Sequence, residues 1–346
     1  MKLTNLILCA TALLIAGCNS SDTGKSGQTV GSLPIQQRAG DTYSVTHDLG
    51  PLYVVESPKN DPFYAEAARR PWVSWWYPAS RTTMFQPNGT RAAPLQKLDS
   101  WSRKIYGSSP SAVDFEIDNR ANAYEDWEGL CHGWARASIM EANEPSSART
   151  VDGVTYEVGD LKAILLKTYE NLKGEKFYGQ RYTHPRTDDI NDIYPDQFHR
   201  FLQSELFTKH KAFIMDIDPD QPVWNFPAWA AQLEIVKDTK DSRVLHVTAY
   251  VRYTSPFVKD ANIDYAGFGD PSLTPFHPYT YDLYGQPQGD GSWKVDGGVW
   301  TGSSLDDHPD YVVSEPEHGD HWSSNPNIDT AKVKELLNRA GFPLTN

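Results

Sequence analysis

The chain has 346 residues, and its formal net charge at pH 7 is −13. This acidic balance argues against a nucleic-acid partner, because phosphate binding needs basic patches and the sequence shows none. Aromatic residues are plentiful (11 Trp, 18 Tyr and 13 Phe), so the chain can build a sizeable core in one large domain or two small ones.

The first 17 residues predict a signal peptide. Lys2 precedes an apolar run that is too short to span a bilayer, and the run ends in Ile-Ala-Gly before Cys18. These small residues resemble a bacterial lipoprotein cleavage box, so we expect cleavage to remove Cys9 and to leave Cys18 as the lipid-carrying N-terminus. Asn19 resembles the residue found in lipoproteins sorted to the outer membrane, facing either the periplasm or the surface. The alternative is an ordinary secreted protein in which Gly-Cys occurs by chance.

Residues 18–40 are polar and rich in Gly and Ser, which predicts a flexible tether, and residues 41–346 form the expected folded domain. No later segment is apolar for long enough to span a membrane. Early in the domain, the aromatic segment 72–78 could line a substrate groove or fill the core.

One thiol, Cys131, would remain after cleavage. In an oxidising compartment a single cysteine is either a reactive thiol or a small buried side chain. The apolar spacing after Gly129 predicts a helix over residues 130–142 with Cys131 in its first turn. There the helix dipole would lower the pKa of the thiol, and the unpaired N–H groups could hold an oxyanion. Gly133 within this helix indicates a close approach of another segment, unless both glycines simply mark a turn.

A catalytic cysteine needs a base, and it should come from elsewhere in the chain, because the adjacent His132 would point in another direction. His199 lies in the first turn of a predicted helix that begins at Pro195. His246 lies on the polar face of a predicted strand. Each of these two could instead be an ordinary surface or core histidine.

Helical spacing predicts helices over residues 159–174, 195–207 and 327–341. Alternation over residues 243–254 predicts a half-buried antiparallel strand. Four more segments look like strands: 211–217, 231–236, 278–285 and 292–300. Helices cluster early and strands late, which favours an α+β fold over a doubly wound sheet. In this fold, an early helical part carrying the cysteine helix packs on a later, mostly antiparallel sheet.

Metal binding is only weakly indicated. Three histidines lie among carboxylates near the C-terminus and could bind a metal or lie in a solvated loop: His308, His318 and His321. Segments around Asp218 and Asp290 could offer oxygens to calcium, but neither is a loop of spaced ligands. The sequence therefore requires no cofactor, although calcium is possible.

Three stretches, in order, resemble segments of the transglutaminase elicitor family, known from Phytophthora cell-wall glycoproteins and from bacteria such as vibrios. Residues 127–135 (WEGLCHGWA) resemble the active-site segment, and residues 192–199 (DIYPDQFH) resemble a D-V-N-P-x-x-F-H segment. Residues 223–235 (VWNFPAWAAQLEI) are similar to the V-W-N-Q-P-V segment that plants recognise as an elicitor peptide. The resemblance extends over most of residues 70–315.

The resemblance implies a protein-glutamine γ-glutamyltransferase with a papain-like or transglutaminase-like active site. It makes Cys131 the nucleophile, favours His199 over His246 as the base and implies Asp192 as the orienting carboxylate. The Cys131 thiolate would form a thioester with a glutamine side chain and pass the acyl group to a lysine amine.

Trp127 and Trp134 flank the cysteine and are expected to contact the substrate and to exclude water from the thioester. If water does enter, the enzyme is a glutamine deamidase. The remaining alternatives are a papain-like peptidase or amidase with the same residues, and a non-catalytic surface-anchored binding module with a buried thiol. The expected partners are protein substrates bearing Gln and Lys side chains, and a membrane that holds the lipid anchor.

Overall fold

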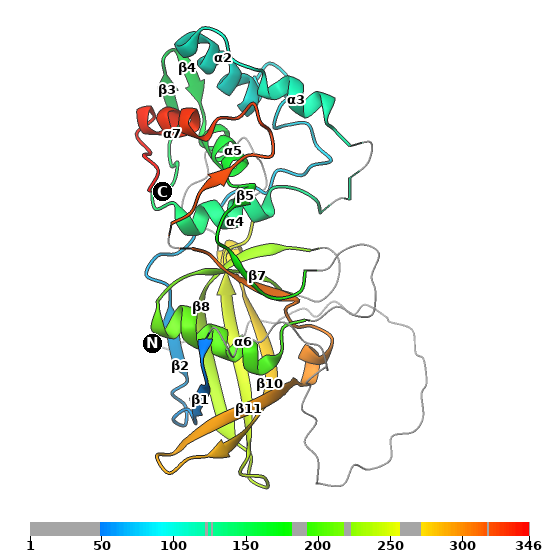
Figure 1. Ribbon diagram of the computed structural model, residues 1–346, viewed down its shortest axis with the longest axis vertical. Helices are drawn as coiled ribbons and strands as arrows, with labels where there is room; N and C mark the ends of the chain where they lie inside the picture. Colours follow the sequence, from blue (N-terminus) through cyan, green and yellow to red (C-terminus); the bar gives the residue numbers. More distant parts are fainter. Residues whose placement is uncertain are drawn as a thin grey trace, which may run out of the picture. The chain divides into compact units, whose positions relative to one another are not determined.

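The computed structural model describes residues 49–121, 124–125, 127–181, 192–217, 223–256, 271–316 and 318–345 (Figure 1). They all belong to one compact unit, Ile35–Asn346, whereas the other unit, Met1–Pro34, contains none of them. The predicted signal peptide, Cys18 and the tether therefore lie outside the described residues. Among the described helices, none has the length and apolar character needed to cross a membrane.

The described strands form one large antiparallel sheet and two small ones. The large sheet has nine strands in the order β1-β11-β10-β9-β8-β7-β12-β6, and β2 also pairs with β8. Its strands are β1 (Leu52–Val55), β2 (Phe63–Glu66), β6 (Lys176–Gly179), β7 (Phe213–Asp216), β8 (Asn225–Lys237), β9 (Val244–Tyr253), β10 (Phe276–Pro287), β11 (Ser292–Trp300) and β12 (Tyr311–Ser314). The small sheets pair β3 (Arg149–Val151) with β4 (Val154–Tyr156) and β5 (Asn171–Leu172) with β13 (His321–Trp322).

The alternation predicted for residues 243–254 is confirmed in β9. Leu245 and Val247 are almost fully buried, whereas Arg252 on the opposite face is exposed. β9 lies in the middle of the sheet, paired with β8 on one side and β10 on the other. Its apolar face therefore contributes to the core beneath the centre of the sheet.

All four predicted helices are present, with different ends. The helices are α2 (Pro94–Tyr106), α3 (Ala112–Asp118), α4 (Cys131–Met140), α5 (Val158–Thr168), α6 (Pro195–Leu202) and α7 (Thr330–Arg339), with short helical turns η1 (Gln203–Thr208), η2 (Pro271–Leu273) and η3 (Gly302–Leu305). α5 ends at Thr168 rather than at Gly174, because the chain leaves the helix to pair as β5 with β13. α7 is capped by Asp329 as its sequence predicts: the Asp329 carboxylate accepts from the N–H of Ala331 at 2.9 Å.

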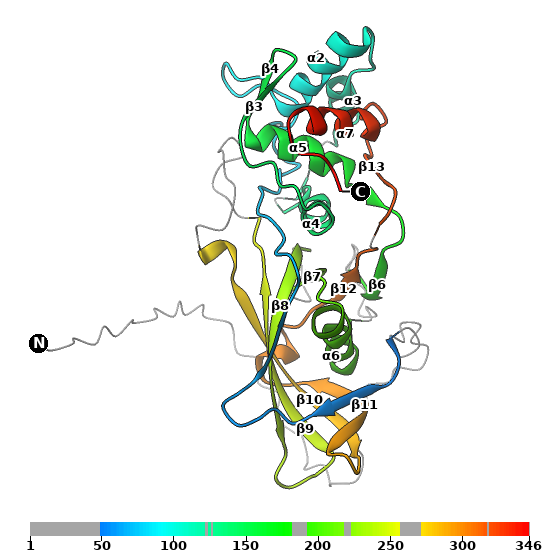
Figure 2. The same cartoon turned by 90° about the vertical axis from the view of Figure 1, so that its left-hand side faces the viewer.

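The cysteine helix α4 joins the helical part to the sheet. It packs on α5 on one side and on β7 and β8 on the other (Figure 2). α6, in contrast, packs on β10 and β11. The predicted α+β arrangement, with an early helical part carrying the cysteine helix against a later antiparallel sheet, is confirmed.

The aromatic segment 72–78 is part of the core. Trp72, Trp75 and Tyr77 are buried, and the Trp72 indole N–H donates to the Glu141 carbonyl at 3.1 Å. Trp76 is only half-buried, and its ring meets the edge of Trp224 with centroids 5.0 Å apart. Packing is therefore the main role of this segment, and Trp76 is its member with partial access to solvent.

Candidate active site

Cys131 is the first residue of α4, as predicted. The turn before it is fixed by the N–H of Leu130, which donates to the Trp76 carbonyl at 2.7 Å. Gly129 is required there, because an added Cβ would lie 2.6 Å from the Trp76 ring. Gly133 is required for the close approach of α5, because its Cβ would lie 2.8 Å from the Leu166 carbonyl oxygen. Both glycines therefore fix where the helix begins and how closely it packs.

The Cys131 sulfur lies in a small polar cluster that the sheet supplies. The residue is 6% exposed, and the side-chain N–H of Asn225 points at the sulfur with Nδ2 3.7 Å from Sγ. Asn225 is the first residue of β8, and its Oδ1 accepts from the Tyr311 hydroxyl at 2.7 Å. The thiol is thus covered, with two linked polar side chains behind it.

The pKa of the Cys131 thiol is raised, contrary to the prediction from its place at a helix N-terminus. Burial is the largest cause, because it penalises the thiolate. The main-chain and side-chain N–H groups of Asn225 and the charge of Arg181 lower the pKa, while Asp216 raises it. The thiol is therefore protonated at neutral pH, and it would have to lose its proton to act as a nucleophile.

His199 is not placed as a base for this thiol. It is fully buried on α6, where its Nδ1 is bonded to the Tyr281 hydroxyl at 2.8 Å. Its Nε2 has no hydrogen-bond partner among the described residues, so no hydrogen bond joins it to Cys131. Burial, and then the charge of Arg200, lowers the pKa of His199 to about 3, far below that of an effective base at neutral pH.

Asp192 does not orient His199 either. Its Oδ2 lies 3.3 Å from Nε2 of His308, and Nδ1 of His308 donates to the Ser304 carbonyl at 2.9 Å. The His308 ring stacks on Trp300. The acidic side chain thus pairs with a histidine that sequence reasoning had placed in a possible metal cluster or a solvated loop.

The other predicted histidines have partners other than Cys131 among the described residues. His246 is exposed on β9 between Asp282 and Asp238, at 2.7 and 3.0 Å, and the hydrogen bond to Asp282 is the main reason that its pKa is raised. His321 stacks on Tyr169. In the part of the chain that the structure describes, His308, His318 and His321 do not form a common group of metal ligands.

The two tryptophans differ in their surroundings. Trp134 is fully buried, and its indole N–H donates to the Trp72 carbonyl at 3.0 Å. It packs the core instead of contacting a substrate, which corrects the expectation from the sequence. Trp127 is only partly buried against the core, so it keeps a surface that a substrate could contact.

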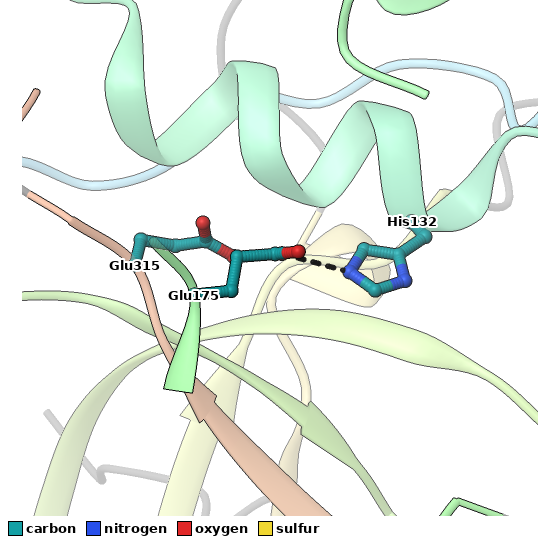
Figure 3. Close-up of side chains that lie close together, drawn as sticks. All are labelled: His132, Glu175 and Glu315. Carbon is teal, nitrogen blue, oxygen red and sulfur yellow. Dashed lines mark hydrogen bonds and ion pairs between the residues drawn. The ribbon is translucent and has the colours of Figure 1, made fainter. Parts of the chain in front are cut away.

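A second polar group, which sequence reasoning missed, involves His132, the neighbour of Cys131 in the chain. Figure 3 shows Glu175 between His132 and Glu315, and the His132 Nε2 lies 3.2 Å from Glu175 Oε1. Arg136, one turn along α4, donates to both oxygens of Glu175 at 2.7 and 2.5 Å. Burial lowers the pKa of His132 to about 4, with Arg136 adding to it. The imidazole is therefore neutral at physiological pH.

The carboxyl groups of Glu175 and Glu315 are in opposite states. Burial raises the pKa of Glu175, but the hydrogen bonds from His132 and Arg136 outweigh it and lower the pKa to about 2. Burial, followed by the nearby charge of Glu175, raises the pKa of Glu315 well above its usual value. Oxygen atoms of the two carboxyl groups lie within 4.8 Å of each other, and two buried carboxyl groups this close do not both ionise readily, so we assign a proton to Glu315. His132, Glu175 and Glu315 each have a potential metal-ligand atom within 4.8 Å of the others, and the Arg136 guanidinium supplies positive charge beside them through its bonds to Glu175.

Neither polar group could be found from sequence spacing. Asn225 lies within the stretch 223–235 that resembles the elicitor peptide, but the resemblance gave it no role. Glu175 and Glu315 lie far apart in the sequence and are joined only because β6 and β12 pair as neighbouring strands. Strand pairing in the sheet, and not a local sequence motif, brings together the residues of both polar groups.

Comparison with known proteins agrees with this architecture. The sequence profile of the transglutaminase elicitor family matches residues 118–341. The chain belongs to the transglutaminase elicitor family.

A solved structure supports the fold of this family member. The crystal structure of the GP42 transglutaminase from Phytophthora sojae has a TM-score of 0.58 and 18% sequence identity, over 83% of this chain and 94% of that chain. At this identity the similarity shows a shared fold. No curated protein matches the sequence.

Proposed function

We propose that this member of the transglutaminase elicitor family is a protein-glutamine γ-glutamyltransferase with Cys131 as its nucleophile. Membership of the family supports a transglutaminase-like domain. The observation that carries the proposal is the sulfur itself, at the start of α4, with the N–H groups of Asn225 directed at it. N–H donors fixed beside a reacting sulfur can stabilise the charge that develops when a thiol attacks an amide.

In the proposed reaction, the Cys131 sulfur attacks the carbonyl carbon of a glutamine side chain. The C–S bond forms, the C–N bond breaks, and the proton lost by the thiol leaves with the nitrogen as ammonia. An amine then attacks the thioester, which forms the new amide bond and returns a proton to the sulfur. Because the resting thiol is buried and protonated, its ionisation must accompany the binding of a glutamine.

The substrates and the location of the protein are part of the same proposal. The acyl donor is a glutamine side chain of a protein and the acceptor is a lysine side chain. Cys18, at the N-terminus left by signal cleavage, would carry the lipid that holds the domain at the outer membrane. Metabolic labelling of the expressed chain with a fatty acid, compared with Cys18→Ser, tests that attachment.

The activity is tested by incubating the full chain with a fluorescent primary amine and a glutamine-rich protein, with and without calcium. We expect amine incorporation and ammonia release, and we expect Cys131→Ala to lose both while its circular dichroism stays unchanged. Ammonia release without incorporation would indicate a deamidase, and peptide fragments would indicate a peptidase. Incorporation by Cys131→Ala would remove the proposal altogether.

A further inference from the structure

Asn225 is a polar side chain buried in the protein, where an unpaired amide group would destabilise the fold. It is 1% exposed and opens β8 directly opposite Asp216 of β7. A buried amide must have both ends satisfied. Its Nδ2 faces the Cys131 sulfur at 3.7 Å, and its Oδ1 accepts from the Tyr311 hydroxyl at 2.7 Å.

The Tyr311 hydroxyl bonds to the oxygen end of the Asn225 amide, which leaves the N–H end facing the sulfur. Tyr311 is fully buried, and burial keeps its pKa well above the usual value, so the hydroxyl stays protonated and can donate. A flipped amide would place its oxygen against the sulfur, where it would repel the negative charge that the sulfur acquires as it loses its proton. The hydrogen bond from Tyr311 and the contact with the sulfur therefore favour the same orientation of the Asn225 amide, in which an N–H points at the sulfur.

We propose that Asn225 is a catalytic residue that donates its side-chain N–H to the oxyanion of the thioester-forming step, and that Tyr311 is the positioning residue that holds the amide in that orientation. This inference rests on the proposed function of Cys131. When the sulfur attacks, electrons of the carbonyl double bond move to its oxygen, only one carbon away from the sulfur. The oxyanion then lies beside the donors that faced the sulfur at rest.

The surroundings make such a donor effective. The N–H groups of the first turn of α4 have no partner within the helix, so they can share the oxyanion with Asn225. The site is enclosed, and a fixed donor in an enclosed site stabilises developing charge more than water does. Removal of one oxyanion donor costs on the order of 10²–10³ in kcat in other acyl-transfer enzymes.

A purely structural role for Asn225 makes a different prediction, because it would affect folding and not the chemical step. The chain offers matched controls for the comparison. Asn325 is also a 1% exposed asparagine, and its Nδ2 donates to the Ala112 carbonyl at 2.9 Å. Tyr281 is also a fully buried tyrosine with a bonded hydroxyl.

The experiment measures kcat and KM for amine incorporation, ammonia release, and the pH profile of Cys131 alkylation by iodoacetamide. For Asn225→Ala, we expect kcat to fall about 10²–10³-fold with KM little changed, and the alkylation profile to shift to higher pH. Asn225→Asp, which keeps the shape and the bond to Tyr311 but has no donor, should behave alike. Tyr311→Phe should show a smaller loss of kcat and a shift of the alkylation profile in the same direction.

The control variants Asn325→Ala and Tyr281→Phe should lose stability while kcat per folded molecule and the alkylation profile stay at the wild-type values. An active wild-type chain with an equally active, folded Asn225→Ala variant overturns this inference and leaves the proposed function standing. A wild-type chain that neither incorporates amine nor releases ammonia overturns both.

Discussion

The buried carboxyl group of Glu315 should make the stability of this protein depend on pH in an unusual direction. Glu315 is 2% exposed and faces Glu175, and its pKa in the folded protein is raised well above the ordinary value of 4.5. Above pH 4.5 the unfolded chain releases this proton, whereas the folded protein keeps it. The stabilisation is therefore fully present below pH 4.5 and is lost as the pH rises toward the folded-state pKa.

The size of this pH dependence follows from the single proton that Glu315 holds in the folded protein. Each pH unit above 4.5 should remove about 1.4 kcal/mol from the free energy of unfolding, for as long as Glu315 stays protonated in the folded state. Glu175 contributes in the opposite direction, because its pKa of about 2 is below the ordinary 4.5. Its contribution is present above pH 4.5 and is lost as the pH falls toward 2, so it is constant in measurements above pH 5. His132 is neutral in the folded protein over this range, but its pKa is about 4 there and 6.5 in the ordinary imidazole, so its contribution to stability grows as the pH rises from 5 toward 6.5. Wild type and Glu315→Gln share this contribution, so it cancels in the difference between them.

The informative variant is Glu315→Gln, which keeps the shape of the side chain and offers a permanent N–H donor to Glu175. Urea unfolding followed by tryptophan fluorescence gives the free energy of unfolding of both proteins from pH 5 to pH 8. We expect the advantage of the variant over the wild type to grow by about 1.4 kcal/mol per pH unit and then to level off. Glu234→Gln, on an exposed part of β8, is the control. A difference that stays flat from pH 5 to pH 8 would show that Glu315 is already ionised in the folded protein.

Two further predictions concern the helix that carries the nucleophile and the histidine that does not reach it. Gly133→Ala gains about 1 kcal/mol of helix propensity but pushes a Cβ to 2.8 Å from the Leu166 carbonyl, which costs about 1–3 kcal/mol. The melting temperature of Gly133→Ala should fall by several degrees. Gly289→Ala, which has nothing within 4 Å of the new Cβ, should melt like the wild type. Equal melting of all three proteins would contradict the close approach of α4 and α5. His199→Phe should remove the partner of Tyr281 and lower stability, yet leave the pH profile of cysteine alkylation unchanged. A shifted profile would mean that the imidazole does act on the thiol.

Local features of this chain could be predicted well. The place of Cys131 in the first turn of a helix followed from the glycine before it and the apolar spacing after it, and the α+β arrangement followed from the order of helical and alternating segments. These properties depend on residues that are close in the sequence. The prediction for the end of α5 was wrong because pairing with β13, more than 140 residues away, ends the helix earlier.

The partners of the thiol could not be predicted in the same way. A histidine in a motif that resembles the family was expected beside the sulfur, but the helix that carries it packs on β10 and β11. The side chain that does contact the sulfur, Asn225, comes from the first residue of a strand. Likewise, the predicted fall in thiol pKa considered only the helix dipole, and burial by the sheet outweighs it.

The burial and protonation of the Cys131 sulfur also affect how readily it is oxidised. Oxidants and disulfides react with an accessible thiolate, so a thiol that is 6% exposed and carries its proton is a poor target for both. A thiol enclosed in this way can stay reduced for long periods in surroundings that would convert an open, ionised cysteine to a mixed disulfide or a sulfenic acid. Its enclosure by the sheet thus protects this cysteine from oxidation.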